Sequence, residues 1–118
     1  MFKGILSVFI FVTTLATSTE TGNASWYGES WNGRKTASGE IFDSSKNTCA
    51  HNKLKMGTII RVTNIENGKS VTCKVNDRGG FAKYGRVLDM SKGSFSVIGN
   101  VNKGVIRVKI EIIKYNKK

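Results

Sequence analysis

Runs of alternating apolar and polar residues, separated by short turns, are the feature that most restricts the fold of this chain. Residues 104–113 read Gly-Val-Ile-Arg-Val-Lys-Ile-Glu-Ile-Ile, the pattern of a β-strand with one buried face. Residues 69–75 alternate in the same way, and residues 58–63 are rich in β-branched side chains. The pair Asn67–Gly68 stands between these two runs and predicts a hairpin turn. The chain is therefore expected to fold mainly as β-sheet.

The remaining elements are predicted to be short. Strands are expected at 23–27 and 87–88, and helical turns at 44–50 and 91–98, the second of them capped by Ser91 and ended by Gly99. Many short strands with two short helices predict a compact barrel, because closure removes the edges of a small sheet. The length of 118 residues corresponds to one domain, which we expect from about residue 23 to residue 113, after a polar entry segment at 19–22.

The N-terminus has the pattern of a secretory signal peptide. Lys3 is followed by an apolar run at 4–15, and Ala16 and Ser18 are small residues suited to a cleavage site. We predict a signal peptide at 1–18 and a mature domain at 19–118, with a buried first helix or an uncleaved anchor as alternatives. No cysteine stands directly after the apolar run, so no lipid anchor is expected. The protein is predicted to be exported, either periplasmic or secreted.

The chain contains two cysteines, Cys49 and Cys73. In an exported protein such a pair predicts one disulfide, and the alternative is two buried free thiols. A metal site is not expected, because two sulfurs and the single histidine, His51, do not complete a tetrahedral shell.

The formal net charge is +11, which favours an anionic partner. Nucleic acid, anionic lipid and anionic wall polymer all have the required charge, and the predicted export favours the wall polymer over nucleic acid. The alternative is that the charge serves only solubility.

Three acidic residues stand in or beside predicted turns: Glu40, Asp77 and Asp89. Cleavage of a glycan requires an acid that protonates the departing oxygen and a base or nucleophile, and two carboxyls in different environments can fill both roles. Asp77 is followed by Arg78 and two glycines, which would let a polymer approach the backbone closely. The alternative is that Asp77 caps a turn or pairs with Arg78.

Histidine and aromatic residues near these carboxyls are further candidates. His51 could act as a base, orient another group by a hydrogen bond, or be a satisfied core residue. Four aromatic residues lie around the glycine-rich stretch 33–40 and could stack on sugar rings or fill the core: Trp26, Tyr27, Trp31 and Phe42. The chain has no phosphate-binding glycine loop, serine elbow or zinc-ligand spacing, and no cofactor is expected.

Taken together, several segments resemble the rare lipoprotein A (RlpA) family, in order and over nearly all of the predicted mature chain. The matching segments are Ala24-Ser-Trp-Tyr-Gly28, Gly33-Arg-Lys-Thr-Ala-Ser-Gly-Glu40, Ala50-His51, Gly57-Thr58, Val62-Thr-Asn64, Asn67-Gly68, Val75-Asn-Asp-Arg-Gly79 and Val87-Leu-Asp-Met-Ser91. The resemblance implies an all-β fold, a six-stranded double-psi β-barrel with one or two short helices. That fold is related to expansins and barwin-like endoglucanases.

The resemblance also implies an activity, that of an endolytic peptidoglycan transglycosylase. Such an enzyme cleaves the MurNAc–GlcNAc bond without water and leaves a 1,6-anhydro-muramyl end, typically on glycan strands without stem peptides. It implies Asp77 as general acid, with the base role as a further option for the same carboxyl. Glu40 and His51 would tune or orient Asp77, and Asp89 is a secondary candidate. The expected substrate-binding residues are Trp26, Tyr27, Trp31 and Arg78.

The chain departs from the family in ways that leave other functions open. We expect neither the lipid-attachment cysteine nor the C-terminal SPOR domain that family members often carry, and Gly80 and Met56 replace usual prolines. A Cys49–Cys73 disulfide would pin the His51 segment to the strand that leads to Asp77. The alternatives are a non-catalytic, expansin-like wall-loosening module, a hydrolase of another β-glucan and, most remote, a cytoplasmic nucleic-acid-binding protein. We expect a monomer whose partner is the peptidoglycan glycan strand.

Overall fold

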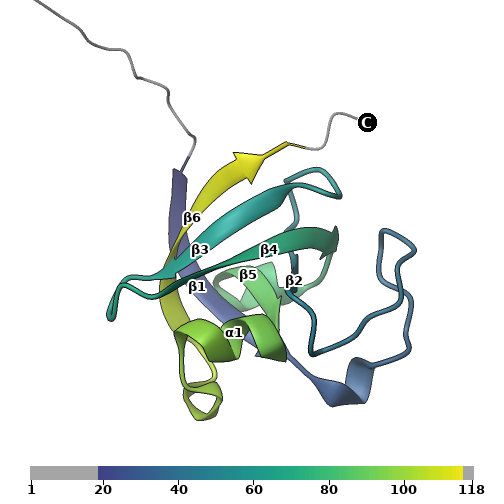
Figure 1. Cartoon of the computed structure of the whole chain (residues 1–118), viewed down its shortest axis with the longest axis horizontal. Helices are drawn as coiled ribbons and strands as arrows, with labels where there is room; N and C mark the ends of the chain where they lie inside the picture. The colour runs from purple at the N-terminus through teal and green to yellow at the C-terminus, as the bar shows by residue number, and fades with distance from the viewer. Residues whose placement is uncertain (1–18, 116–118) are drawn as a thin grey trace, which may run out of the picture.

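Six strands close into a barrel in the computed structural model, which describes residues 19–115 (Figure 1). The strand order around the barrel is β1-β5-β2-β4-β3-β6. The elements, in chain order, are β1 (Thr19–Tyr27), the 3-10 helix η1 (Glu29–Trp31), β2 (Thr48–Ala50), β3 (Ile59–Asn64), β4 (Ser70–Asp77), the 3-10 helix η2 (Phe81–Tyr84), β5 (Arg86–Ser91), α1 (Lys92–Ile98), the 3-10 helix η3 (Val101–Lys103) and β6 (Ile106–Lys114).

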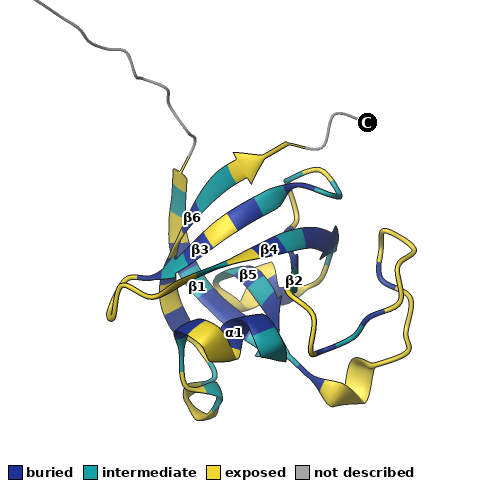
Figure 2. Cartoon of the chain, in the orientation of Figure 1, coloured by how far each residue is buried: buried dark blue, intermediate teal, exposed yellow. Residues whose placement is uncertain are grey.

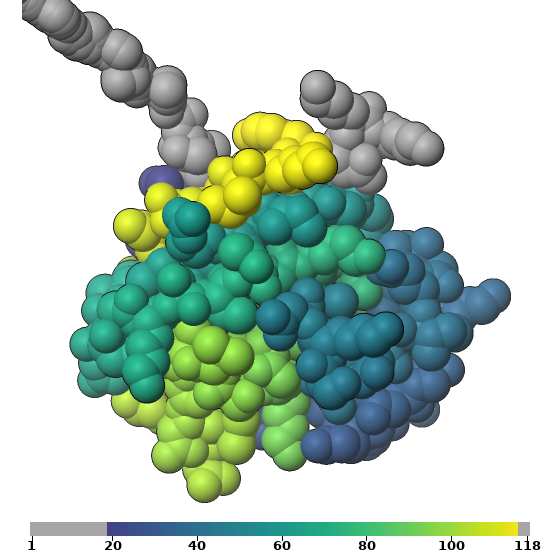
Figure 3. Space-filling model, in the orientation of Figure 1, coloured from purple at the N-terminus to yellow at the C-terminus, as the bar shows by residue number. Residues whose placement is uncertain are grey.

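Two parallel pairings distinguish this barrel from a simple meander. β1 pairs in parallel with β5, and β2 pairs in parallel with β4, whereas the other four pairings are antiparallel. Parallel neighbours require crossover connections rather than tight turns. The connection between β1 and β2 is long, and it packs as a lobe beside the barrel (blue in Figure 3). The all-β, six-stranded prediction is confirmed.

The core follows the alternation that the sequence predicted. In β6, Ile106, Val108 and Ile110 are buried, while Arg107 and Lys109 between them are exposed (Figure 2). Helix α1 covers one end of the barrel, and its Phe95 and Ile98 side chains are fully buried and extend the apolar core. The buried apolar residues are Ala24, Cys49, Ile60, Val62, Cys73, Val75, Leu88, Met90, Phe95, Ile98, Ile106, Val108 and Ile110. Truncation of one such large side chain to alanine typically costs about 2–5 kcal/mol.

The hairpin and the second helix lie where the sequence predicted them. β3 and β4 flank the turn that contains Gly68, whose φ of 76° is in the left-handed region that favours glycine. Ser91 caps α1 by accepting a hydrogen bond from the Ser94 amide, and Gly99 ends the helix. The short strand predicted at 87–88 extends over the whole of β5.

Two sequence predictions about local structure were wrong. The polar entry segment at 19–22 is the first part of β1, because its backbone pairs with β6 although its side chains are largely polar. The helix predicted at 44–50 does not form. Its last three residues are β2, which lies between β4 and β5.

Tertiary contacts explain why the segment at 44–50 is not helical. The Gly93 amide donates to the Ser44 carbonyl, and the Ser91 hydroxyl donates to the Lys46 carbonyl, at 2.8 and 2.6 Å. These bonds occupy carbonyls that a helix would use internally. A Cβ on Gly93 would lie 2.8 Å from the Ser44 oxygen, so only glycine permits this approach.

The predicted disulfide is present between Cys49 of β2 and Cys73 of β4, with 6.0 Å between the Cα atoms. Both residues are buried, so the bond ties two neighbouring strands together inside the barrel. Among residues 19–115, no helix is long and apolar enough to cross a membrane. The predicted signal peptide at 1–18 lies outside the described residues.

Candidate active site

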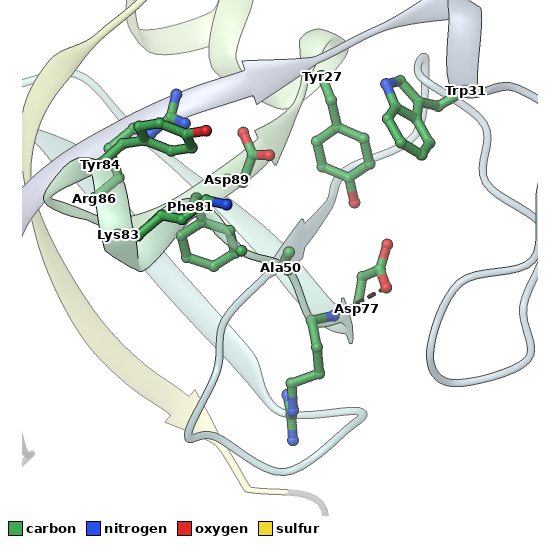
Figure 4. Close-up of a pocket in the computed structure, with 12 residues that line it drawn as sticks. Tyr27, Trp31, Ala50, Asp77, Phe81, Lys83, Tyr84, Arg86 and Asp89 are labelled. Atoms are coloured by element: carbon green, nitrogen blue, oxygen red, sulfur yellow. Dashed lines mark hydrogen bonds between the residues drawn. The ribbon is translucent and has the colours of Figure 1, made fainter.

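A cleft of about 380 Å³ opens where β1, β4 and β5 come together with η2 (Figure 4). Two of the predicted carboxyls, Asp77 of β4 and Asp89 of β5, line the cleft. They lie on either side of β2, where both are paired with Ala50. The lining residues are Tyr27, Trp31, Ala50, Asp77, Arg78, Gly79, Gly80, Phe81, Lys83, Tyr84, Arg86 and Asp89.

Asp77 is the last residue of β4, and its carboxylate is held by two backbone donors. Its Oδ1 accepts hydrogen bonds from the amides of Ala37 and Arg78, both at 2.9 Å. The Ser38 amide donates to the Asn76 carbonyl beside it, at 3.1 Å. The glycine-rich loop around residues 33–42 is thus docked onto the end of β4, and the orientation of the Asp77 carboxylate is fixed.

Asp89 lies on β5, and its environment disfavours the ionised form. Burial is the main cause that raises the pKa of Asp89, and the negative charge of Asp77 adds to it. A hydrogen bond from the Ser25 hydroxyl to Oδ1, at 2.8 Å, and the positive charge of Arg86 act in the opposite direction. The net effect is that Asp89 keeps its proton to a higher pH than a free aspartate does.

Tyr27 ends β1 with its hydroxyl directed toward Asp77 (Figure 4). The hydroxyl is buried, and no described residue meets it with good hydrogen-bond geometry, although the Asp77 carboxylate is close enough to interact with it. Burial raises the pKa of Tyr27, as do the negative charges of Asp77 and Asp89, so the phenol stays protonated. Its ring stacks on Phe42, 4.4 Å between centroids, and meets Trp31 edge-on. The site therefore contains a buried phenol donor that is held by ring packing beside the Asp77 carboxylate.

His51 does not line the cleft, and its buried ring is fully engaged elsewhere. Nδ1 accepts from the Lys53 and Leu54 amides, and Nε2 lies 2.9 Å from a carboxylate oxygen of Glu20. Because Nδ1 is an acceptor, the ring proton is on Nε2 and donates to Glu20. This arrangement anchors the turn that follows β2.

The backbone of His51, rather than its ring, reaches the Asp77 motif. Its amide donates to the Asp77 carbonyl at 3.1 Å, and its carbonyl accepts from the guanidinium of Arg78. The structure therefore places His51 where it can position Asp77 and Arg78 without touching the Asp77 carboxylate.

Glu40 also lies outside the lining of the cleft. It is exposed, and Lys74 donates to its carboxylate at 2.6 Å. This bond is the main cause that lowers the pKa of Glu40, with smaller contributions from Asn76 and Ser38. Glu40 belongs to the loop whose Ala37 amide holds Asp77, so its connection to the cleft is indirect.

The predicted substrate-binding residues separate into two groups. Tyr27, Trp31 and Arg78 line the cleft, and Trp31 is half-exposed at its rim, with the Arg34 guanidinium 4.9 Å from the ring centroid. Trp26 lies elsewhere, because its indole N–H donates to the Val101 carbonyl and its ring packs against the core. Of the aromatic residues predicted to bind sugar, Trp31 and Tyr27 are therefore the two that line the cleft.

Sequence reasoning missed one side of the cleft. Phe81, Lys83, Tyr84 and Arg86 line it from η2 and the start of β5. The signal that could have found them is the run of aromatic and basic residues directly after Gly79–Gly80. Among residues 19–115, no three histidine, cysteine, aspartate or glutamate side chains are grouped so that they could hold a metal ion.

The closed six-stranded barrel with two parallel pairings defines the class of protein as a double-psi β-barrel. The fold is similar to that of a Streptomyces papain inhibitor, with a TM-score of 0.67 and 19% identity over 82% of this chain and 96% of the inhibitor. It is also similar to a Clavibacter michiganensis expansin solved in complex with cellohexaose, with a TM-score of 0.66 and 20% identity over 82% of this chain and 51% of the expansin. At these identities the likeness concerns the fold alone.

The family follows from the sequence comparisons. Residues 19–110 match the family model described as lytic transglycolase. The chain is 50% identical over 99 residues to the endolytic peptidoglycan transglycosylase RlpA of Neisseria meningitidis, covering 84% of this chain and 41% of that protein. It is 43% identical over 97 residues to the RlpA of Campylobacter jejuni, covering 82% and 35%. The chain belongs to the RlpA-type lytic transglycolase family, and it spans less than half the length of these relatives.

Proposed function

We propose that this protein is an endolytic peptidoglycan transglycosylase that cleaves MurNAc–GlcNAc linkages and leaves 1,6-anhydro-muramyl ends. One observation carries the proposal: Asp77 and Asp89, two carboxyls in different environments, face one open cleft beside the buried hydroxyl of Tyr27. Relatives that are up to 50% identical are named endolytic peptidoglycan transglycosylases, which supports the same chemistry here.

The two carboxyls divide the proton transfers in this proposal. Asp89, whose pKa is raised by burial, donates a proton to the departing GlcNAc oxygen as the bond to the muramyl anomeric carbon breaks. The muramyl 6-hydroxyl oxygen attacks that carbon, and Asp77 takes the hydroxyl proton. Water does not enter the products, and the protons balance because one carboxyl loses what the other gains. This proposal gives the general-acid role to Asp89 instead of Asp77, to which the resemblance assigned it, and the raised pKa of Asp89 supports that choice.

The neighbouring residues serve this chemistry by binding and positioning. The Tyr27 phenol donates a hydrogen bond to a substrate oxygen near Asp77, and Trp31 stacks on a sugar ring at the rim of the cleft. Glu40 and His51 act as positioning residues, because each contacts the loop or the backbone that holds Asp77 and Arg78. Neither touches the reacting atoms.

The partner in this proposal is the peptidoglycan glycan strand, which places the protein in the cell envelope. The predicted signal peptide at 1–18 and the net charge of +11 support export toward an anionic wall. A monomer suffices, because all the proposed functional residues come from one chain.

The decisive experiment digests purified, peptide-free glycan strands with the protein and identifies the products by mass spectrometry. Anhydro-muramyl ends from the native protein, and none from a folded Asp77→Asn variant, are the expected result. Folded native protein that sediments with cell walls but releases no new ends would favour the wall-loosening alternative. Reducing ends released from cellulose would favour a β-glucan hydrolase.

A further inference from the structure

Strand β5 contains one residue more than its parallel neighbour β1 at the point where their pairing begins. Asn23 of β1 pairs with Arg86, and the next residue, Ala24, pairs with Leu88, so Val87 is the extra residue. An irregularity of this kind changes the face to which the neighbouring side chains point. The side chain that it redirects here is that of Arg86.

Strict alternation along β5 would point Arg86 away from Asp89. Side chains three residues apart in a strand lie on opposite faces. Leu88 and Met90, on either side of Asp89, are fully buried in the core, so Arg86 would be directed inward and Val87 outward. In the structure, Val87 packs against the core, and Arg86 lines the same cleft as Asp89. The extra residue thus brings a cation and a carboxyl of one strand to one cleft.

A glycine of β1 accommodates the displaced Val87. A Cβ on Gly22 would lie 2.7 and 2.8 Å from the two methyl carbons of Val87, so one of the two strands would have to move. The glycine of β1 and the extra residue of β5 therefore fit each other, and the barrel itself sets the direction of the Arg86 side chain.

The guanidinium of Arg86 is held in the cleft without being neutralised. Its carbon lies 5.2 Å from the ring centroid of Tyr84, and Figure 4 shows the two side chains together at one side of the cleft, next to Asp89. The Nε of Arg86 is buried and has no hydrogen-bond acceptor. The ion pairs among residues 19–115 all involve other cations. The charge of Arg86 is therefore available to a carboxylate that forms in the cleft.

The surroundings of Asp89 contain several titratable or charged groups. Burial is the main cause that raises the pKa of Asp89. Among the charges, that of Arg86 lowers this pKa and that of Asp77 raises it, and the Ser25 hydroxyl donates a hydrogen bond. The titratable and charged residues that line the cleft with Asp89 are Tyr27 of β1, Asp77 of β4, Arg78 directly after it, Lys83 and Tyr84 of η2, and Arg86 of β5.

On the basis of the proposed function, we propose that Arg86 is a positioning residue that stabilises the carboxylate left on Asp89 once its proton has moved to the departing GlcNAc oxygen. A general acid must hold its proton before the reaction and release it in the transition state. Burial of Asp89 serves the first requirement. The guanidinium serves the second, because its attraction to Asp89 grows as the negative charge develops. Arg86 thus acts through Asp89.

The ionisation of Asp89 can be measured apart from any turnover. The chain contains three aspartates, Asp43, Asp77 and Asp89, so carboxyl-carbon NMR of aspartate-labelled protein can follow each of them, and Asp89→Asn assigns the signal. In Arg86→Gln, Asp89 should titrate at a higher pH than in the native protein, because its carboxylate has lost a cation. On peptide-free glycan strands, kcat should fall about tenfold or more, and the alkaline limb of the pH–rate profile should move to higher pH.

Matched variants separate the charge of Arg86 from its packing. Arg86→Lys keeps the charge and should keep the Asp89 titration close to the native one, whereas Arg86→Met keeps only an apolar stem and should behave like Arg86→Gln. Lys69→Gln removes a charge from the exposed β3–β4 hairpin and should change neither the titration nor kcat. Gly22→Ala should also raise the pH at which Asp89 titrates, because the added Cβ displaces Val87 and with it Arg86.

The outcomes separate this inference from the proposed function. An unchanged Asp89 titration in folded Arg86→Gln and Arg86→Met would overturn the inference, even where native protein forms anhydro ends. A shifted titration without a loss of kcat would overturn it as well, because Arg86 would then have no part in the reaction. An unchanged titration in folded Gly22→Ala would overturn the role of the extra residue. A shifted titration in a protein whose native form never produces anhydro ends would instead contradict the transglycosylase.

Discussion

The cleft around Asp77 and the pocket around His51 lie on opposite sides of Phe81 and Arg86, which line both of them. In the smaller pocket, each polar atom of the His51 ring has a partner, and the ring is buried. In the cleft, the Tyr27 hydroxyl and the Arg86 Nε are buried without a well-formed hydrogen bond, and burial raises the pKa of Asp89.

This contrast gives a criterion for distinguishing groups that react from groups that support them, although both belong to the same set of sequence motifs. The His51 ring has no free donor or acceptor with which to bind a ligand, because all its hydrogen bonds are made within the fold. Polar groups without partners, and a carboxylate whose charge is disfavoured by burial, indicate instead a site where a ligand can supply the missing hydrogen bonds. On this basis we propose that Asp89, together with the Asp77 carboxylate that lines the same cleft, carries the chemistry, and that His51, Glu20 and Glu40 support it.

The largest expected effect comes from Asp77→Asn. The asparagine oxygen can still accept from the Ala37 and Arg78 amides, so the fold should be unchanged, whereas the loss of the base should reduce kcat by about a thousandfold or more. Product formation from peptide-free strands and thermal unfolding measure the two quantities. A large loss of stability in this variant would show that Asp77 has a structural role, which would contradict the contrast between the Asp77 cleft and the His51 pocket.

Asp89→Asn should change activity and stability in opposite directions. Loss of the acid should reduce kcat about a hundredfold, while removal of a desolvated charge should raise the free energy of unfolding at pH 7 by up to about 1 kcal/mol.

The effect of Asp89→Asn on the free energy of unfolding should depend on pH, in a direction set by the raised pKa of Asp89. The pKa of Asp89 is raised in the folded state, so the stability contributed by its protonated form is complete below the unfolded pKa and is lost as the pH rises through the folded pKa. The gain in stability of Asp89→Asn should therefore be small under acidic conditions and grow toward neutrality. Denaturant unfolding at several pH values measures it, and a variant less stable at pH 7 would contradict the prediction.

His51→Ala should act mainly on stability. It removes a buried ring with three hydrogen bonds, which should cost about 2–3 kcal/mol of unfolding free energy. The pH–rate profile of the folded fraction should keep its shape, because the ring exchanges no proton with the substrate. If the rate of the His51→Ala variant no longer changed with pH on one side of the profile, His51 would be a catalytic residue.

Glu20→Gln is the matched control for the His51 pair. The glutamine oxygen can still accept from Nε2 of a neutral ring, so the unfolding free energy should change by less than about 0.5 kcal/mol. A cost as large as that of His51→Ala would mean that the pair depends on charge.

The smallest effect is expected for Glu40→Gln. The ion pair with Lys74 is exposed at both partners and should contribute about 0.5 kcal/mol or less, and kcat should fall only several-fold, because the loop that holds Asp77 loosens. Steady-state kinetics on glycan strands measure this. A loss of kcat equal to that of Asp77→Asn would show that Glu40 reaches the reaction directly.

The β-rich class, the hairpin at Gly68 and the capped helix α1 could be predicted from the sequence, because alternation, an Asn-Gly turn and a serine cap are local signals. The sequence also predicted the Cys49–Cys73 bond and Asp77 as a candidate. The resemblance to the RlpA family added the barrel topology, which no local pattern encodes.

Tertiary structure alone decided the rest. The segment at 44–50 lost its predicted helix because Ser91 and Gly93, far along the chain, bind its carbonyls. Asp77 and Asp89 line the cleft, because β4 ends there and β5 passes beside it. Glu40 is held outside the cleft by Lys74, and the His51 ring by Glu20. Burial, pairing and pKa depend on neighbours distant in sequence, and a pattern of residues along one chain does not contain those neighbours.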